Sequence, residues 1–180
     1  MDLRSFALST PRLRLAAFRP EDAAEIFAAV TPAVTRFMSF DPSPSLEAFA
    51  AVWPRWLDQM AAGLELFPVL RLAESGEFVG VSGLHGLDRA EPDAGLWLRE
   101  SAQGRGLGPE AVAALIGWAA DTCGVRAVLW PVVEANLRSR RLAERLGGVV
   151  VGTRRLRKGA FELPEIVYRI PARAGVAGGR

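Results

Sequence analysis

Residues Gln103-Gly104-Arg105-Gly106-Leu107-Gly108, read as QGRGLG, stand between a short apolar segment and a long apolar run. Glycines allow successive backbone N–H groups to turn toward one point, and a helix that follows adds unpaired amides and the positive end of its dipole. The stretch therefore predicts a cradle for a diphosphate. A tight strand-to-helix turn without a ligand is the alternative, since glycine-rich turns are common.

The segments beside this loop predict a strand, a helix and a second strand. Residues 93–99 form the strand that enters the loop, Pro109 and Glu110 open a helix that is apolar nearly all round, and residues 125–133 form the next strand. This order favours a parallel right-handed crossover with a ligand at the carboxyl ends of the strands. Because proline cannot donate to a ladder, Pro131 indicates that the second strand lacks a neighbour at that point, which would open a slot beside the loop.

The rest of the chain predicts a mixed α/β fold. Residues 13–18 read as a strand, 20–30 as a helix, and 45–63 as a helix kinked at Pro54 and ended by Gly63. Residues 66–72 and 78–84 read as an antiparallel hairpin, 136–146 as a helix, and 149–157 with 166–170 as a closing antiparallel pair. The segment after Pro171 is rich in small residues and is expected to fray. We expect one domain over residues 1–180.

Composition narrows the function. With a single cysteine, Cys123, and a single histidine, neither an intramolecular disulfide nor a Cys/His metal cluster is expected, so no metal is predicted. No apolar run reaches membrane-spanning length and the opening residues lack a secretion core, so a cytoplasmic protein is expected. Basic residues crowd residues 138–158, and they can steer an anion, but without an aromatic-rich basic motif nucleic acid is only a minor alternative.

The sequence and position of the loop argue against two other nucleotide-binding motifs. A Walker A loop places Lys-Ser or Lys-Thr after its last glycine, whereas Gly108 precedes Pro109-Glu110. A Rossmann site places its glycine turn after the first strand, whereas this loop lies at mid-chain. Both readings therefore become minor.

Three ordered motifs resemble the GNAT superfamily of acyl-CoA-dependent N-acetyltransferases. Gln103, Gly106 and Gly108 match the family's phosphate loop, Gln/Arg-x-x-Gly-x-Gly/Ala. The segments TPRLRLAAFRPED near the start and NLRSRRLAERLGG at 136–148 resemble the branch containing the ribosomal-protein N-terminal acetyltransferases. The resemblance implies a mostly antiparallel seven-stranded sheet with a central parallel splayed pair and about four flanking helices. It also implies acetyl-CoA as co-substrate.

The resemblance assigns expected roles to individual residues. The implied CoA-binding residues are Trp97, Leu98, Arg99, Gln103, Gly104, Arg105, Gly106, Leu107, Gly108 and Asn136. Asp93 aligns with an acid common in the branch and is a candidate proton acceptor, with a solvated loop carboxylate as the alternative. His85 is a second base candidate, and Ser139 stands where the branch places a serine that bonds the departing thiolate or orients the cofactor. Asn136 can also cap the helix that it precedes.

Three positions depart from the pattern. Pro109 replaces a residue that is often Ser or Thr, Gly148 replaces the expected Phe, and Ala143 stands where many members place a tyrosine acid. The predicted activity is acetyl transfer from acetyl-CoA to a primary amine by direct attack, with a protein N-terminal α-amine as the acceptor. A small-molecule amine such as a polyamine or aminoglycoside, and a non-catalytic CoA-binding regulatory module, are the alternatives. A homodimer is plausible from the branch.

Overall fold

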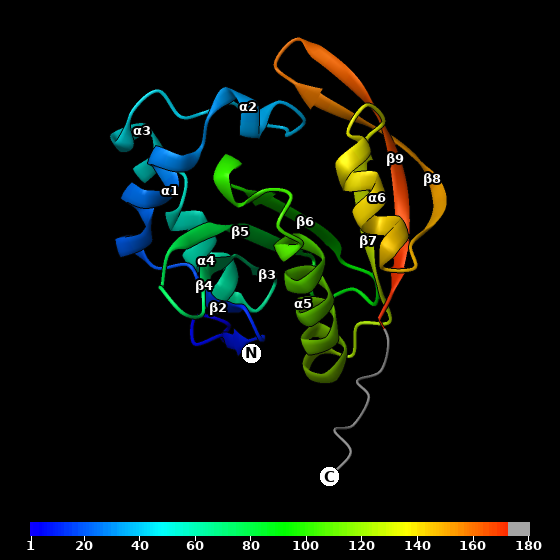
Figure 1. Cartoon of the computed structure of the whole chain (residues 1–180), viewed down its shortest axis with the longest axis horizontal. Coiled ribbons are helices and arrows are strands. Elements are labelled where there is room, and N and C mark those ends of the chain that lie inside the picture. Colours follow the sequence, from blue (N-terminus) through cyan, green and yellow to red (C-terminus); the bar gives the residue numbers. More distant parts are fainter. Residues whose placement is uncertain (173–180) are drawn as a thin grey trace.

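Nine strands form one mixed sheet in the computed structural model, which describes residues 1–172 (Figure 1). The main path of the sheet runs β1-β2-β4-β5-β6-β7-β9-β8, and β3 pairs with β5 beside it. Every pairing is antiparallel except that of β6 with β7. The strands are β1 (Ala7–Ser9), β2 (Leu13–Ala17), β3 (Glu65–Leu66), β4 (Pro68–Leu72), β5 (Phe78–His85), β6 (Asp93–Leu98), β7 (Ala127–Val133), β8 (Val149–Lys158) and β9 (Phe161–Pro171).

The strand count differs from the expected seven for two local reasons. Residues 7–9 add a strand to the sheet edge, with Ala7 opposite Ala16. The predicted strand 66–72 is interrupted at Phe67, so that β3 pairs with β5 while β4 pairs with both β2 and β5. The closing hairpin is also longer than predicted, because β8 and β9 pair as far as Lys158 and Phe161 at its tip.

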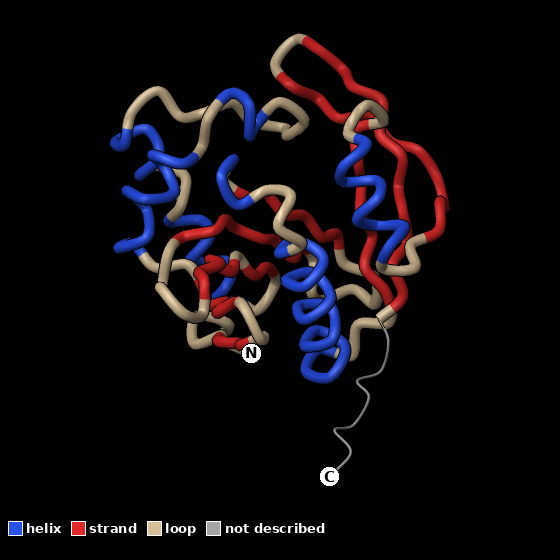
Figure 2. The backbone as a smooth tube through the Cα atoms, viewed as in Figure 1, coloured by secondary structure: helices blue, strands red, loops and turns tan. Residues whose placement is uncertain are grey.

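Six α-helices and two 3-10 turns flank the described sheet (Figure 2). The predicted helix 45–63 is divided, because Pro54 occupies the first position of a new helix, where its missing N–H costs nothing. Gly63 ends this helix in a left-handed conformation, as predicted. The helices are η1 (Pro20–Asp22), α1 (Ala23–Ala29), α2 (Pro32–Thr35), α3 (Leu46–Ala50), α4 (Pro54–Ala62), η2 (Glu100–Ala102), α5 (Leu107–Cys123) and α6 (Leu137–Arg145).

The two faces of the sheet carry different helices. Leu96 and Leu98 point toward α5 and α6, since a Cβ on Gly108 would contact both leucines and Leu142. Side chains alternate along a strand, so Asp93, Gly95 and Trp97 belong to the other face. That face carries α4, whose Trp56 stacks on Phe67 at a centroid distance of 4.8 Å. Phe49 is buried in the core, and Trp53 and Trp56 pack against it.

β6 and β7 separate soon after they meet. Their parallel pairing is registered at a single pair, Asp93 opposite Leu129, near the start of β6. Beyond it β7 continues to pair with β9, where Pro131 lies opposite Val167. The prediction that the strand of Pro131 lacks a neighbour on one side is confirmed, and the missing neighbour is the second half of β6. The segment expected to fray, after Pro171, lies mostly outside the described residues.

Candidate functional site

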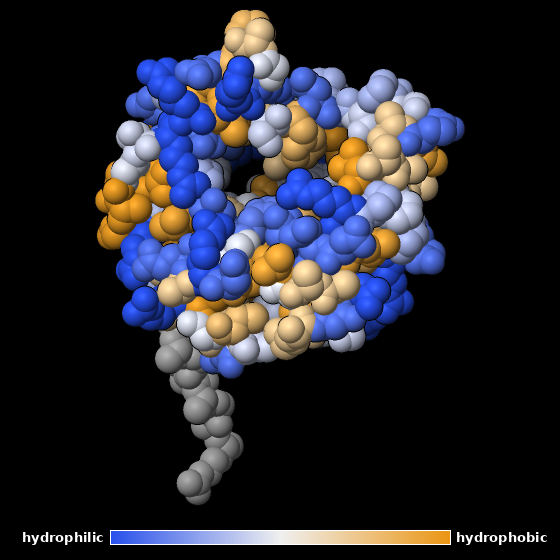
Figure 3. Space-filling view, turned by 180° about the vertical axis from the view of Figure 1, so that it is seen from behind, coloured by the Kyte–Doolittle hydropathy of each residue, from blue (hydrophilic) through white to orange (hydrophobic). Residues whose placement is uncertain are grey.

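A cavity of about 920 Å³ occupies the space between the diverging strands. Its volume lies within the range of about 300–1,000 Å³ that is typical of small-molecule sites. From behind, the space-filling view shows a hollow in the upper half of the molecule (Figure 3). The second half of β6, the second half of β7, the glycine loop, the start of α5, one side of α6 and the residues around α2 line this cavity.

The backbone of β6 presents Leu96 and Leu98 to this cavity. Arg99 donates its N–H to Val79 of β5 at 2.9 Å, and backbone groups alternate in direction along a strand. The N–H and C=O groups of Leu96 and Leu98 therefore point toward β7. Trp97 and Leu98 both line the cavity, whereas Arg99 does not. Sequence reasoning missed Leu96, whose backbone direction becomes apparent only from the ladder.

The glycine loop has the backbone conformation that a cradle requires. Gly104 and Gly106 adopt left-handed φ angles of 76° and 74°, which residues with a Cβ rarely adopt. Gly106 is the N-cap of α5, so the helix begins at Leu107 rather than at Pro109 as predicted. Pro109 thus occupies the third helical position, where its missing N–H would have no partner within the helix. Gly104, Gly106, Leu107 and Gly108 line the cavity, but Arg105 does not.

The side-chain amide of Gln103 makes two hydrogen bonds to neighbouring elements. Its Nε2 donates to the carbonyl of Leu98 at 3.0 Å, and its Oε1 accepts from Nη1 of Arg138 at 2.9 Å. This side chain therefore joins the end of β6 to the first turn of α6. Arg99 turns away, because its Nη2 contacts Glu77 at 2.6 Å. The cavity rim gains positive charge from Arg138, Arg141 and Arg145 of α6.

The start of α6 brings Asn136 and Ser139 to the cavity. Asn136 is the N-cap, because its Oδ1 accepts from the Ser139 N–H at 3.2 Å. The Ser139 hydroxyl oxygen accepts from Nε1 of Trp130 at 2.9 Å, so its own O–H proton can be donated elsewhere. Ala143 is fully buried, and Tyr168 donates its hydroxyl to Glu144 at 2.9 Å without lining the cavity. Neither position supplies a tyrosine acid.

Asp93 and His85 are brought together at the start of β6, outside the cavity lining. They lie opposite each other in the β5–β6 ladder, where cross-strand partners share one face. His85 Nδ1 lies 3.4 Å from a carboxylate oxygen of Glu65, and its ring packs edge-on against Phe67. These contacts direct the imidazole toward α4 and the edge of β3.

The Asp93 carboxylate has a partner that the sequence did not reveal. Arg154 of β8 donates from Nη1 and Nη2 to its two oxygens at 3.0 and 3.1 Å. Glu165 lies beside Arg154 in the β8–β9 ladder and is 9 % exposed. Burial raises the pKa of Glu165, Arg154 opposes that rise and Asp93 adds to it. Two carboxyl groups and one guanidinium thus meet on the face of the sheet opposite α5 and α6.

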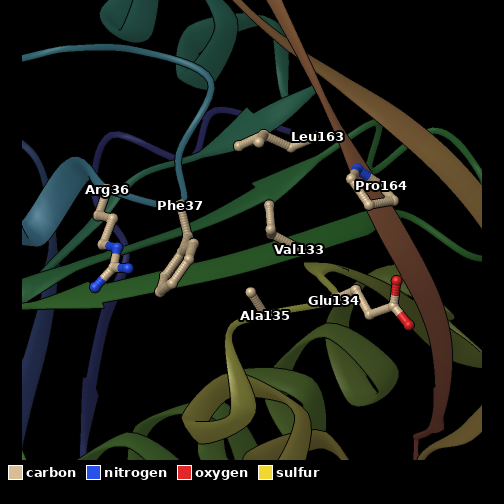
Figure 4. Close-up of a pocket in the computed structure, with 7 residues that line it drawn as sticks. All are labelled: Arg36, Phe37, Val133, Glu134, Ala135, Leu163 and Pro164. Carbon is tan, nitrogen blue, oxygen red and sulfur yellow. The ribbon is translucent and has the colours of Figure 1, made fainter.

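A second cavity of about 490 Å³ adjoins the first, and four residues line both cavities. In Figure 4, Phe37 reaches toward Val133 and Ala135, β9 contributes Leu163 and Pro164 on the opposite side, and Arg36 and Glu134 stand at the two ends. Lys158 at the hairpin tip donates to the carbonyl of Thr35 at 2.6 Å and contacts Asp41 at 3.0 Å. This contact closes the hairpin over the residues after α2.

No group of three or more His, Cys, Asp or Glu residues within positions 1–172 could hold a metal ion. Across the same residues, no helix combines the length and apolar character needed to cross a membrane.

A splayed parallel pair followed by a glycine loop at a helix N-terminus is the arrangement that the sequence resemblance implies for an acyl-CoA-dependent acyltransferase. A family model for the acetyltransferase (GNAT) domain matches residues 12–149, so the chain belongs to the GNAT acetyltransferase family. It is therefore an acetyltransferase that uses acetyl-CoA and acts on an amine. No curated protein sequence matches the chain at a significant level.

Several solved structures share this fold at low sequence identity. RimJ from Mycobacterium smegmatis, in complex with CoA-disulfide, has a TM-score of 0.78 and 18% identity, with 89% of this chain and 82% of that chain covered. A spermidine N-acetyltransferase from Vibrio cholerae, in complex with CoA and spermine, has a TM-score of 0.76 and 14% identity, with coverages of 89% and 97%. A GCN5-related N-acetyltransferase from Brucella melitensis has a TM-score of 0.76 and 19% identity, with coverages of 96% and 81%.

Proposed function

We propose that this acetyltransferase modifies the N-terminal α-amine of a protein, with acetyl-CoA as the donor. The observation that carries the donor half of the proposal is the cavity between β6 and β7, which runs from the glycine loop to the residues after α2. The acceptor half is supported by the motifs resembling the ribosomal-protein branch and by a second cavity that adjoins the first. When bound, acetyl-CoA supplies an activated thioester.

The phosphates of the donor would lie against the N–H groups between Gly104 and Gly108. Left-handed glycines and the start of α5 direct such groups toward an anion. Arg138, Arg141 and Arg145 add positive charge at the rim of the same cavity. Leu96 and Leu98 would align the pantetheine arm by strand-like hydrogen bonds, and an N–H on this strand would polarise the thioester carbonyl.

Proton transfer is assigned to two side chains. A protonated amine is not a nucleophile, so a base must accept a proton before or during attack. Asp93 faces the side of the sheet opposite α5 and is the proposed acceptor of that proton, through water. Ser139 lines the cavity with its O–H proton available, and it is proposed to stabilise the departing thiolate. His85 remains a second base candidate, although its contact with Glu65 turns it toward α4.

The acceptor would enter through the cavity shown in Figure 4. Its walls are largely apolar, with Arg36 and Glu134 at the ends, which suits a short peptide segment with an ammonium group and a following backbone. A polyamine or another small amine is the second candidate, favoured by the carboxyl groups of Asp93 and Glu165 on the same face. A CoA-binding module without turnover is the third.

Two measurements separate these possibilities. Calorimetric titration compares acetyl-CoA with acetyl-pantetheine, which lacks the nucleotide, and micromolar binding that weakens strongly without the nucleotide is expected. Thiol release is then followed with peptides bearing a free N-terminus, with spermidine and with an aminoglycoside. Turnover of the peptides alone supports the proposed acceptor, and turnover of the small amines alone replaces it with the second candidate.

Binding of acetyl-CoA without acetylation of any amine would favour the third candidate, a non-catalytic CoA-binding regulatory module. No binding of acetyl-CoA would overturn the assignment of the cradle itself. The homodimer expected from the branch is a separate proposal, and light scattering of the purified protein tests it, since a monomeric mass at working concentration would contradict it.

A further inference from the structure

We propose that Arg12, together with Glu110, is a positioning device that aims two amides of the glycine loop at the donor phosphates. Arg12 belongs to the opening motif TPRLRL, lies just before β2, and does not line the cavity. Its Nη1 donates to the carbonyl of Arg105 at 3.0 Å and its Nη2 to the carbonyl of Gly106 at 3.1 Å. The inference rests on the CoA cradle proposed above.

These two carbonyls determine where the next two N–H groups point. In a planar trans peptide, the C=O of one residue and the N–H of the following residue point in opposite directions. Because Arg12 holds the carbonyls of Arg105 and Gly106, the N–H groups of Gly106 and Leu107 are turned away from Arg12. Gly106 and Leu107 line the cavity while Arg12 and Arg105 do not, so the opposite side is the cavity.

Glu110 fixes the guanidinium in this position. Its Oε2 accepts from Nε of Arg12 at 2.6 Å, and its Oε1 accepts from the backbone N–H of Arg12 at 3.0 Å and from the Thr10 hydroxyl at 2.5 Å. Partial burial raises the pKa of Glu110, but the bonds from Thr10 and Arg12 lower it by more. The carboxylate therefore stays ionised and holds the fork of Arg12 against the loop.

A flexible glycine loop needs such a support from outside. Gly104 and Gly106 have no Cβ to restrict their backbone, so the loop would lose conformational freedom on binding a phosphate. Because Arg12 already restricts the loop, the loop loses less conformational entropy when the donor binds. The loop binds the nucleotide part of the donor. Loss of Arg12 should therefore change the Kd and KM for acetyl-CoA and leave kcat unchanged.

The test compares Arg12→Ala and Arg12→Lys with the control Arg14→Ala. Arg14 is an exposed arginine of β2, so its removal costs the same charge without touching the loop. Arg12→Ala is expected to raise the Kd and KM for acetyl-CoA about tenfold, with kcat and the Kd for acetyl-pantetheine unchanged. Arg12→Lys keeps the charge but lacks the planar guanidinium that donates to both carbonyls. It is expected to recover less than half of the lost affinity.

Three outcomes would overturn the inference. One is an equal acetyl-CoA affinity in Arg12→Ala and Arg14→Ala, and another is full recovery by Arg12→Lys, which would make the effect one of charge alone. The third is an equal loss for acetyl-CoA and acetyl-pantetheine, which would indicate general damage to the fold. If the unaltered protein fails to bind acetyl-CoA, the cradle and this inference fail together, and that result is distinct from the other three.

Discussion

Arg154 of β8 holds Asp93 of β6 by two hydrogen bonds of 3.0 and 3.1 Å, reaching across the two strands that separate them in the sheet. The bonds to Asp93 raise the pKa of Arg154. The pair joins the hairpin of β8 and β9 to the start of β6. The hairpin, which lines the proposed acceptor cavity, is thereby held to the proposed catalytic carboxyl. Removing either partner is therefore expected to affect chemistry as well as geometry.

Asp93→Asn tests the proposed base. The amide keeps the shape of the side chain but cannot accept the proton, and a general base contributes about 10²–10⁴ to the rate. We expect kcat/KM at pH 7 to fall about hundredfold and to recover as the pH rises, because more of the acceptor amine is then already neutral. The pH dependence of kcat/KM measures this.

The control for that variant is Asp88→Asn, in the exposed turn between β5 and β6. It removes one carboxylate without touching Arg154 and should leave the profile unchanged. If Asp93→Asn also leaves the shape of the profile unchanged, Asp93 is not the base.

Gly106→Trp tests the cradle. A Cβ at this position would lie 3.6 Å from Nη2 of Arg12, so an indole would push against Arg12 and displace the loop that lines the cavity. The Kd for acetyl-CoA is therefore expected to rise at least about hundredfold in a calorimetric titration. The substitution also strains a backbone with φ of 74°, and Gly76 provides the matched control because its φ is 73°. A Cβ on Gly76 would meet nothing within 4 Å, so Gly76→Trp carries the same strain at the β4–β5 turn. Equal affinities in the two variants would reject the cradle.

Glu165→Gln is expected to stabilise the protein at neutral pH. Burial raises the pKa of Glu165 above its unfolded value of 4.5, while Arg154 lowers it and Asp93 raises it. Above the unfolded pKa, the unfolded chain ionises more readily than the folded chain, so the carboxyl lowers the free energy of unfolding as the pH rises through that range. The amide carries no charge at any pH and avoids this loss.

The expected gain is a higher Tm at pH 7, and it should disappear as the pH falls to the unfolded pKa of 4.5, where the carboxyl is increasingly protonated in both states. Thermal unfolding across this pH range measures it, with the exposed Glu162→Gln on the same strand as the control. A lower Tm for Glu165→Gln at pH 7 would show that the attraction of Arg154 outweighs the burial of the carboxylate.

The sequence was sufficient for the features that depend on neighbouring residues. Pro131 indicated the separation of β6 and β7, Gly63 the end of α4 and Asn136 the start of α6, because each follows from local backbone chemistry. The glycines predict the cradle in the same way, although the helix begins at Leu107, two residues before the predicted start at Pro109, with Gly106 as its N-cap.

The contacts that support the site could not be read from local patterns. Arg12 and Glu110 are 98 residues apart, and Arg154 and Asp93 are 61 apart, so only the folded sheet brings each pair together. From the sequence, Arg154 belongs to the basic stretch of residues 138–158, which is expected to steer an anion. The direction of the β6 backbone groups was equally hidden, because it depends on which strand accepts the N–H of Arg99.

The tip of the closing hairpin is expected to control access for the acceptor. Lys158 Nζ donates to the carbonyls of Thr35 and Phe40 at 2.6 and 3.3 Å and contacts Asp41 at 3.0 Å, so one ammonium joins β8 to the residues that follow α2. Lys158→Met keeps the apolar stem but removes all three contacts. We expect the KM for the acceptor to change about fivefold. The KM for acetyl-CoA should change less, because residues 36–38 line part of the donor cavity but the phosphate loop lies elsewhere.

Amide hydrogen exchange provides the structural readout, since residues 36–41 should exchange faster once the hairpin tip is released. Arg157→Met is the matched control, because Arg157 is an exposed cation beside Lys158 on the same strand. A change in the KM for acetyl-CoA as large as that for the acceptor would contradict a role confined to the acceptor side. Unchanged exchange at 36–41 would show that the hairpin stays in place without Lys158, and the contact would then have no control over entry.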